Sequence, residues 1–136
     1  MMRRAARGFT LVDMAVVTAI VGVLASVAMP SYQAQIAKSQ RTDAIAALTR
    51  IQVEQEQFRA HHGSYALALT SLKGASGTLS PGGHYDIALI SAHPGGFIAR
   101  ASPRDTSLRE GGCADLTVTV YDAQAVFGPS ARCWNR

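Results

Sequence analysis

Two cysteines are among the few side chains of this sequence that can do covalent chemistry. Cys113 and Cys133 have no Cys-x-x-Cys spacing and no histidine pair beside them, so they do not form a zinc-binding pattern. If the domain lies in an oxidising compartment, a disulfide between them is the natural interpretation. A bond there closes a loop of about 20 residues, which the chain-entropy model values at about 3 kcal/mol of stability.

The histidines and serines give no catalytic pattern. The chain has four histidines, at His61, His62, His84 and His93. None of them forms a His-x-x-x-His or His-Glu-x-x-His ligand set, and we interpret them as surface or helix-cap residues. Ser80 and Ser130 lack the Gly-x-Ser-x-Gly elbow of serine hydrolases. We therefore expect no enzyme activity, no metal site and no cofactor.

Arginines gather in the C-terminal third of the chain. They are Arg100, Arg104, Arg109, Arg132 and Arg136. The aromatic residues Tyr121, Phe127 and Trp134 lie in the same region. Arginine combined with aromatic rings is the chemistry of sequence-tolerant DNA binding, so these five arginines are candidate DNA contacts. The simpler alternative is a solvated rim of scattered arginines, because four acids share the region.

The element that must carry the rest of the chain is an apolar segment near the N-terminus, which follows three arginines. From Phe9 to Met29 the only ionisable side chain is Asp13, and this length is close to the ~20 residues that span a bilayer. Basic residues stay on the cytoplasmic side of such a span, which places the cysteines across the membrane. Removal of residues 1–8 lowers the net charge from +4 to +1, so the basic composition is partly an effect of that head.

The N-terminal residues carry a family resemblance. Gly8-Phe9-Thr10-Leu11-Val12-Asp13, with the apolar run and Pro30 behind it, resembles the class III signal of type IV pilins and pseudopilins. The closest likeness is to short, PilE/ComP-like minor pilins. The resemblance implies that a prepilin peptidase cuts between Gly8 and Phe9 and that Phe9 is then N-methylated. Conventional cleavage among residues 25–28 is the alternative.

The resemblance also gives roles to three residues of the apolar segment. The family carries an acid at the position of Asp13, usually glutamate, which pairs with the terminal amine of a neighbouring subunit during assembly. An unpaired acid costs ~2.5–3.5 kcal/mol inside a membrane, which favours such pairing, although an acid near the interface can also stay hydrated. Gly22 and Pro30 are expected to kink the helix or loosen it when subunits pack into a fibre.

The remaining residues predict an α+β fold of the type IV pilin kind. We expect a continuous helix from Phe9 to about His61, with a stripe that packs on a sheet. The stripe consists of Ala37, Ala44, Leu48, Ile51, Gln55 and Phe58. Gly63 is the expected C-cap. A loop follows, pinned by Leu67, Leu69, Leu72 and Leu79. An antiparallel four-stranded meander is expected at residues 85–91, 96–102, 116–121 and 124–128.

The sequence thus predicts four parts. Residues 1–8 are a leader, 9–30 the membrane and fibre-core half of the helix, 31–62 its amphipathic half, and 63–136 the loop, sheet and disulfide-bounded region. The resemblance implies a minor pilin that is inserted in the inner membrane, with a periplasmic domain, and assembled into an extracellular pilus for motility, adhesion or DNA uptake. The expected partners are other pilins, the prepilin peptidase, an assembly platform, the lipid bilayer and DNA. A type II secretion pseudopilin and a DNA receptor are the alternatives.

Overall fold

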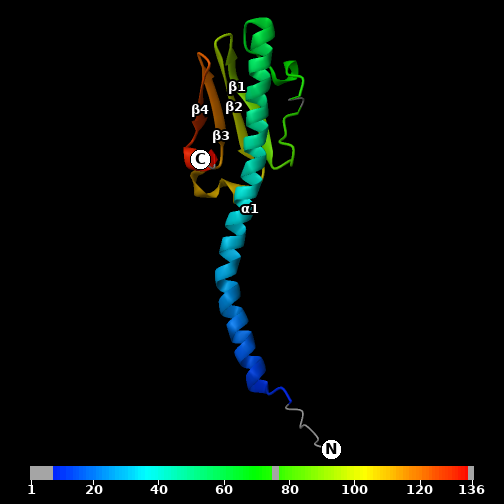
Figure 1. Ribbon diagram of the computed structural model, residues 1–136, viewed down its shortest axis with the longest axis vertical. Coiled ribbons are helices and arrows are strands. Elements are labelled where there is room, and N and C mark those ends of the chain that lie inside the picture. Colours follow the sequence, from blue (N-terminus) through cyan, green and yellow to red (C-terminus); the bar gives the residue numbers. More distant parts are fainter. Residues whose placement is uncertain (1–7, 75–76, 135–136) are drawn as a thin grey trace, which may run out of the picture. The chain divides into compact units, whose positions relative to one another are not determined.

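The computed structural model describes residues 8–74 and 77–134, which form one long helix, a four-stranded sheet and three short 3-10 helices (Figure 1). The elements are α1 (Leu11–His62), η1 (Leu69–Ser71), β1 (Tyr85–His93), β2 (Gly96–Pro103), η2 (Thr106–Gly112), β3 (Leu116–Tyr121), β4 (Gln124–Gly128) and η3 (Ala131–Trp134). The chain divides into two compact units, one ending at Ile36 and the other beginning at Ala37. Arg136 and the predicted leader up to residue 7 lie outside the described residues.

The first unit is an apolar helix whose start is fixed by a reciprocal cap. Asp13 Oδ2 accepts hydrogen bonds from the backbone N–H of Thr10 (2.9 Å) and from its hydroxyl (2.8 Å), and Thr10 Oγ1 accepts one from the Asp13 N–H (3.2 Å). Because Thr10 serves as the N-cap, α1 begins at Leu11 and not at Phe9 as the sequence predicted. The helix continues through Gly22 and Pro30, and its residues up to Gln35 are exposed.

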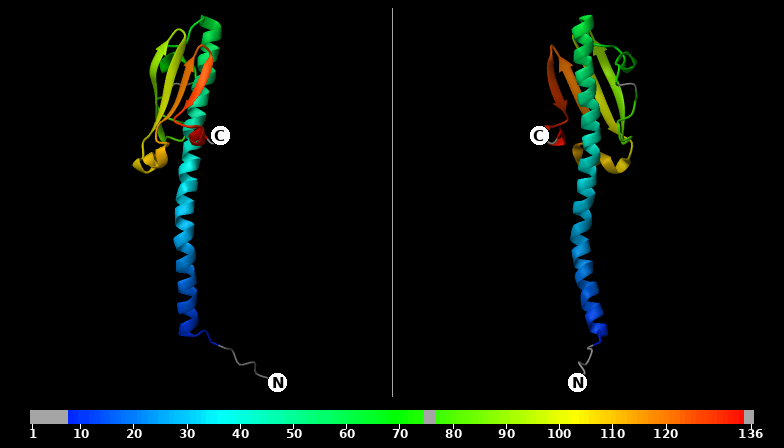
Figure 2. Two further views of the ribbon diagram at one scale, coloured as in Figure 1. Left: turned by 90° about the vertical axis from the view of Figure 1, so that its left-hand side faces the viewer. Right: turned by 45° about the vertical axis from the view of Figure 1, so that its right-hand side comes forward.

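In the second unit, α1 buries one face against the sheet. Ala44, Leu48, Ile51 and Gln55 are buried as the predicted stripe required, and Ala47 joins them. Ala37 and Phe58, at the two ends of the stripe, are only partly buried. Both views of Figure 2 show this part of the helix lying across one face of the sheet. A buried leucine such as Leu48 contributes about 2–5 kcal/mol relative to alanine.

The end of α1 and the following connection are fixed by two local devices. Gly63 takes a positive φ of 76°, and its N–H bonds the Arg59 carbonyl at 2.8 Å, which confirms the predicted glycine cap. Gln55 is fully buried, but its amide accepts a bond from the Ala66 N–H (2.8 Å) and donates one to the Ala66 carbonyl (3.0 Å). A polar side chain can therefore occupy a core position of the stripe.

The loop between α1 and β1 is held differently from the expectation. Of the four leucines predicted to pin it, Leu72 is buried and Leu69 is partly buried, whereas Leu67 and Leu79 are exposed. Hydrogen bonds to α1 also hold this loop in place. The Asp43 carboxylate of α1 accepts hydrogen bonds from the Ser80 hydroxyl and from the Gly82 N–H, the latter at 2.8 Å.

The sheet is an antiparallel meander in the order β1-β2-β3-β4, as predicted. β3 and β4 have the expected bounds, and they meet through Asp122 and Ala123, which both have positive φ. The first two strands are longer than predicted. β1 reaches His93 because a two-residue turn pairs His93 with Gly96, and β2 extends to Pro103 opposite Tyr85. The sheet face toward α1 carries Phe97, Ala99 and Val118, which are all buried.

Candidate functional site

A covalent clasp organises one end of the sheet. Cys113, just after η2, is bonded to Cys133 in η3, with Cα atoms 5.4 Å apart. The Trp134 Nε1–H donates to the Gly128 carbonyl at 2.8 Å, and its ring packs edge-on against Phe127 with centroids 4.7 Å apart. The disulfide-bounded C-terminal region expected from the sequence is therefore present, and it is anchored by an indole as well as by sulfur.

Three of the candidate arginines are attached to this end of the sheet. Arg104 follows β2, Arg109 is in η2, and Arg132 is in η3. β2 ends, β3 begins and β4 ends here, so these short segments converge although they are distant in sequence. Figure 1 shows η2, in yellow, and the C-terminal end, in red, at the same end of the sheet, and the views of Figure 2 show a space between them. All three arginine side chains are exposed, so the convergence places several positive charges on one rim.

Arg100 is placed elsewhere. It pairs in register with Ala88 and Thr117, and it is exposed on the sheet face opposite to the buried Ala99 and Ala101. The structure thus separates Arg100 from the other three. The fifth candidate, Arg136, is outside the described residues.

Acids and aromatic rings modify the arginine rim. Arg104 Nε lies 3.7 Å from Asp86 Oδ1, a loose and exposed ion pair that offsets only part of the Arg104 charge. Of the three aromatic residues expected to accompany the arginines, Trp134 is 4% exposed and Phe127 is partly buried. These two rings stabilise the clasp and are not exposed stacking platforms. Tyr121 is 65% exposed, but it lies at the other end of β3.

The residues predicted for processing and assembly are all in the first unit. Gly8 and Phe9 precede α1, and Phe9 is 80% exposed. Asp13 is occupied by its hydrogen bonds to Thr10. The Thr-x-x-Asp spacing is the sequence signal for this cap, although Thr10 was not among the predicted site residues. α1 passes through both Gly22 and Pro30, and their predicted role as kinks stays a prediction.

The histidines are dispersed over exposed positions. His61 and His62 occupy the last turn of α1, whereas His84 precedes β1 and His93 ends it. Among the described residues, no group of three or more histidine, cysteine or acidic side chains is arranged to hold a metal ion.

One tyrosine of the second unit has a strongly perturbed acidity. Burial and a 2.7 Å hydrogen bond to the Glu56 carboxylate raise the pKa of Tyr65 to about 12. The guanidinium of Arg59 lies 5.2 Å from the centre of the same ring. Burial also raises the pKa of Tyr85. Both phenols thus stay neutral over the physiological range and act as structural groups.

The sequence of the chain is similar to that of a family of pilins. A sequence model of the family described as "Type IV minor pilin ComP, DNA uptake sequence receptor" matches residues 30–117, more than half of the chain.

The curated relatives that this chain matches include pilins and fimbrial proteins from several bacteria. Fimbrial protein EcpC of Eikenella corrodens is 43% identical over 44 residues, covering 32% of this chain and 29% of that protein. A fimbrial protein of Neisseria meningitidis is 38% identical over 72 residues, covering 53% and 42%. The type IV major pilin protein PilE1 of Neisseria gonorrhoeae is 37% identical over 70 residues, covering 52% and 42%. The chain spans less than half the length of these relatives.

The family match agrees with the architecture. A long N-terminal helix, a four-stranded antiparallel meander packed on its second half and a C-terminal disulfide together form the type IV pilin fold. The helix is long and apolar enough to cross a membrane, and none of its most apolar stretch is buried. The chain therefore belongs to the family of the type IV minor pilin ComP, the DNA uptake sequence receptor family.

Proposed function

We propose that this protein is a minor subunit of a type IV pilus and that its exposed domain binds DNA. Pilins are structural proteins rather than enzymes, which agrees with the lack of a catalytic pattern in the sequence. The observation that carries the subunit role is the exposed apolar helix, because a surface of this length is stable only in lipid or against other helices. The partners in the fibre are other pilins.

The processing steps of the proposal follow the residues at the start of α1. The leader is cut after Gly8 by the prepilin peptidase, Phe9 is methylated, and the N-terminus stays cytoplasmic while the domain is periplasmic. The assembly platform then transfers the subunit from the inner membrane into the fibre. Residues 9–30 serve as membrane anchor and fibre core, 31–62 as the amphipathic half of the helix, and 63–136 as the displayed domain.

Asp13 has a defined task in this proposal. Its carboxylate is held by Thr10, the N-cap of its own helix, so pairing with a neighbour's terminal amine must replace or share those bonds. The bonds to Thr10 carry a full charge on the acceptor only, whereas a neighbour's protonated amine would add the opposite full charge, which favours the exchange once a neighbour is present. The acid would thus set the register of subunits along the fibre.

The subunit role is tested by the mass and N-terminal chemistry of the protein purified from membranes and from sheared fibres. The proposal expects a chain that starts at methylated Phe9 in both fractions. A chain that retains Met1, or one that begins after Ala28, would contradict it.

The DNA-binding role rests on the convergence of Arg104, Arg109 and Arg132 on one end of the sheet. Cations on short segments at one end of the sheet can contact neighbouring phosphates. The Cys113–Cys133 bond links the segments that carry Arg109 and Arg132. The description of the family as a DNA uptake sequence receptor supports the same ligand.

The DNA-binding role is tested by salt titration of a duplex with the full chain in detergent micelles. Replacing Arg109 and Arg132 by alanine should weaken binding and reduce the slope of log affinity against log salt by about 1 per arginine. Arg50→Ala is the matched control, because it removes one exposed positive charge from α1. Equal slopes for the control and the double variant would remove this rim from the proposal.

A further inference from the structure

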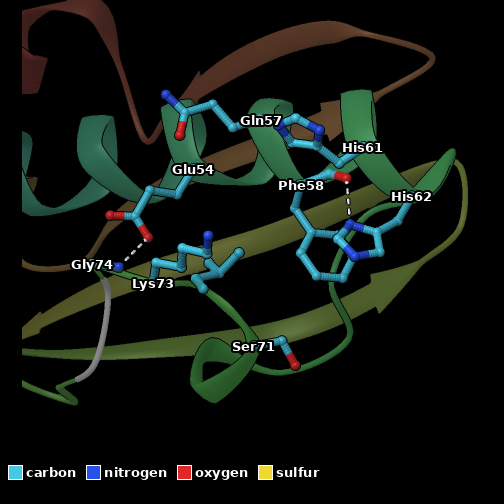
Figure 3. A pocket seen from close by; sticks show the side chains of 9 residues that line it. Glu54, Gln57, Phe58, His61, His62, Ser71, Lys73 and Gly74 are labelled. Atoms are coloured by element: carbon cyan, nitrogen blue, oxygen red, sulfur yellow. Dashed lines mark hydrogen bonds between the residues drawn. The ribbon is translucent and has the colours of Figure 1, made fainter.

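A pocket of about 670 Å³ lies between the last turns of α1 and the connection that follows η1. Figure 3 shows Phe58 extending from α1 toward Ser71 and Lys73, with Gln57 and His61 along the upper edge of the helix. The volume is within the range of ~300–1,000 Å³ that is usual for small-ligand sites. No sequence motif marks this site, because its two walls come from segments that meet only in the folded domain.

The pocket has an apolar floor with fixed geometry. Leu72 is buried, and the Phe58 ring stacks on His62 with centroids 4.0 Å apart and planes inclined by 16°. The His62 Nδ1 lies 3.0 Å from the Phe58 carbonyl oxygen, and a carbonyl can only accept, so Nδ1 carries the proton. This bond holds the ring pair in one orientation, and because each ring covers one face of the other, an incoming ligand can meet only the outer face of the pair.

The charges of the pocket are balanced and partly fixed. Lys73 lies on one wall and the Glu54 carboxylate on the other. The Glu54 carboxylate accepts a hydrogen bond from the Gly74 N–H at 2.7 Å. It also forms an ion pair with Arg50 at 3.2 Å. A Cβ at position 74 would collide with Glu54 and Arg50, so glycine permits this close approach. A free anion would meet the Glu54 carboxylate and a free cation would meet the Lys73 ammonium, so neither is favoured.

The rim offers both kinds of hydrogen-bonding group within a small space. The Gln57 amide and the Ser71 hydroxyl can each donate and accept, the His61 imidazole does both when neutral, and Lys73 donates. A ligand that matches this set is uncharged, has several hydroxyl groups and has one apolar face. A pyranose ring meets all three conditions, because its axial C–H groups form an apolar face and its hydroxyls donate and accept.

We propose that this pocket binds a single uncharged hexose unit of a glycan, with the sugar's C–H face on the outer face of the Phe58–His62 ring pair and its hydroxyls on Gln57, Ser71 and Lys73. The site is separate from the arginine rim, and it gives the displayed domain a second ligand besides DNA. Millimolar affinity for one sugar is the expectation for an open pocket, and display of many subunits on one fibre would raise the avidity.

The test is saturation-transfer NMR of the full chain with methyl glycosides of glucose, galactose and N-acetylglucosamine. The micelles must consist of a detergent without a sugar headgroup, and glycerol serves as the polyol that lacks a ring. The proposal expects transfer to the C–H protons of at least one glycoside and none to glycerol. Absence of transfer for all three glycosides, or tighter binding of sulfate or tetramethylammonium than of any sugar, would overturn it.

Variants then locate the binding on the molecule. Gln57→Ala and Lys73→Ala each change an exposed side chain of the pocket, and each should weaken the glycoside about tenfold. Gln40→Ala is the matched control, because the same residue type on the same helix lines a separate pocket that shares no residue with this one. Unchanged affinity in both pocket variants, or an equal loss in the control, would exclude this pocket.

Discussion

At the scale of single residues, Gln55 shows how one side chain holds a buried connection. Gln55→Ala should lower the unfolding free energy by about 2–4 kcal/mol, because it leaves the N–H and carbonyl of Ala66 buried without their partners. Denaturant unfolding of the chain in micelles, followed by circular dichroism, measures the loss. Gln57→Ala, at an exposed position of the same helix, should stay within about 0.5 kcal/mol of wild type. Similar losses in both variants would contradict the role given to Gln55.

Tyr65 makes stability depend on pH in the alkaline range. Its pKa in the folded protein is about 12, above the ordinary 10.0, so the native state holds the phenolic proton more tightly than the unfolded chain. The resulting stabilisation is complete below pH 10 and is lost as the pH rises toward 12. Unfolding curves across this range should shift to lower denaturant concentration, and Tyr65→Phe should reduce the shift. A residual shift is expected from Tyr85, whose pKa is also raised.

Sequence patterns predicted the positions of single residues in the fold better than they predicted the hydrogen-bond partners of those residues. The 3–4 spacing put Gln55 correctly on the inward stripe, yet nothing in the pattern indicated that its amide would bond Ala66. Asp13 was identified as the one acid of the apolar segment, whereas its bonds to Thr10 follow from a local spacing that the prediction did not use. Hydrogen-bond partners across a loop depend on the final path of the chain, which residue types alone do not determine.

At the scale of elements, the Cys113–Cys133 bond closes a segment that contains β3, β4 and most of η3. Replacing both cysteines by serine should lower the unfolding free energy by about 3 kcal/mol, from a loop with a sequence separation of 20. The Trp134 bond to Gly128 should keep part of the η3 region in place. The measurement is the denaturation midpoint of the double variant beside wild type under identical conditions. An unchanged midpoint would show that the indole contacts suffice.

Element positions were predictable because their causes are local. β3 alternates apolar and polar residues, and the Asp122-Ala123 turn fixes where β4 begins, so both strands were predicted with correct bounds. β1 is longer than predicted because its last residues pair across a tight turn with Gly96 and include an irregularity between Leu89 and Ser91. The convergence of Arg104, Arg109 and Arg132 follows from strand order, which a list of basic residues does not contain.

At the scale of the whole molecule, the proposal requires the subunit to leave lipid and enter a fibre. Asp13→Asn removes the charge that would pair with a neighbour's amine but keeps a side chain of similar size. The subunit should remain in the membrane fraction while its amount in sheared fibres falls about tenfold for each 1.4 kcal/mol of lost pairing. Immunoblots of the two fractions measure the ratio.

The matched control for this substitution is Asp122→Asn in the turn between β3 and β4, where the residue already has a positive φ of 46° that asparagine accepts. The control should assemble like wild type. Equal fibre content for both variants would show that Asp13 does not act through its charge.

The closed segment from Cys113 to Cys133 also makes the protein amenable to exchange of parts. Its two ends are fixed relative to each other by sulfur, and β3 and β4 pair with each other through five residue pairs. We expect such a segment to be exchangeable between pilins when the donor keeps apolar residues at the positions of Leu116, Val118 and Val120 and the backbone pairing of β3 with β2. Chimaeras built in this way would transfer the surface chemistry of the graft while the recipient's own helix still directed assembly.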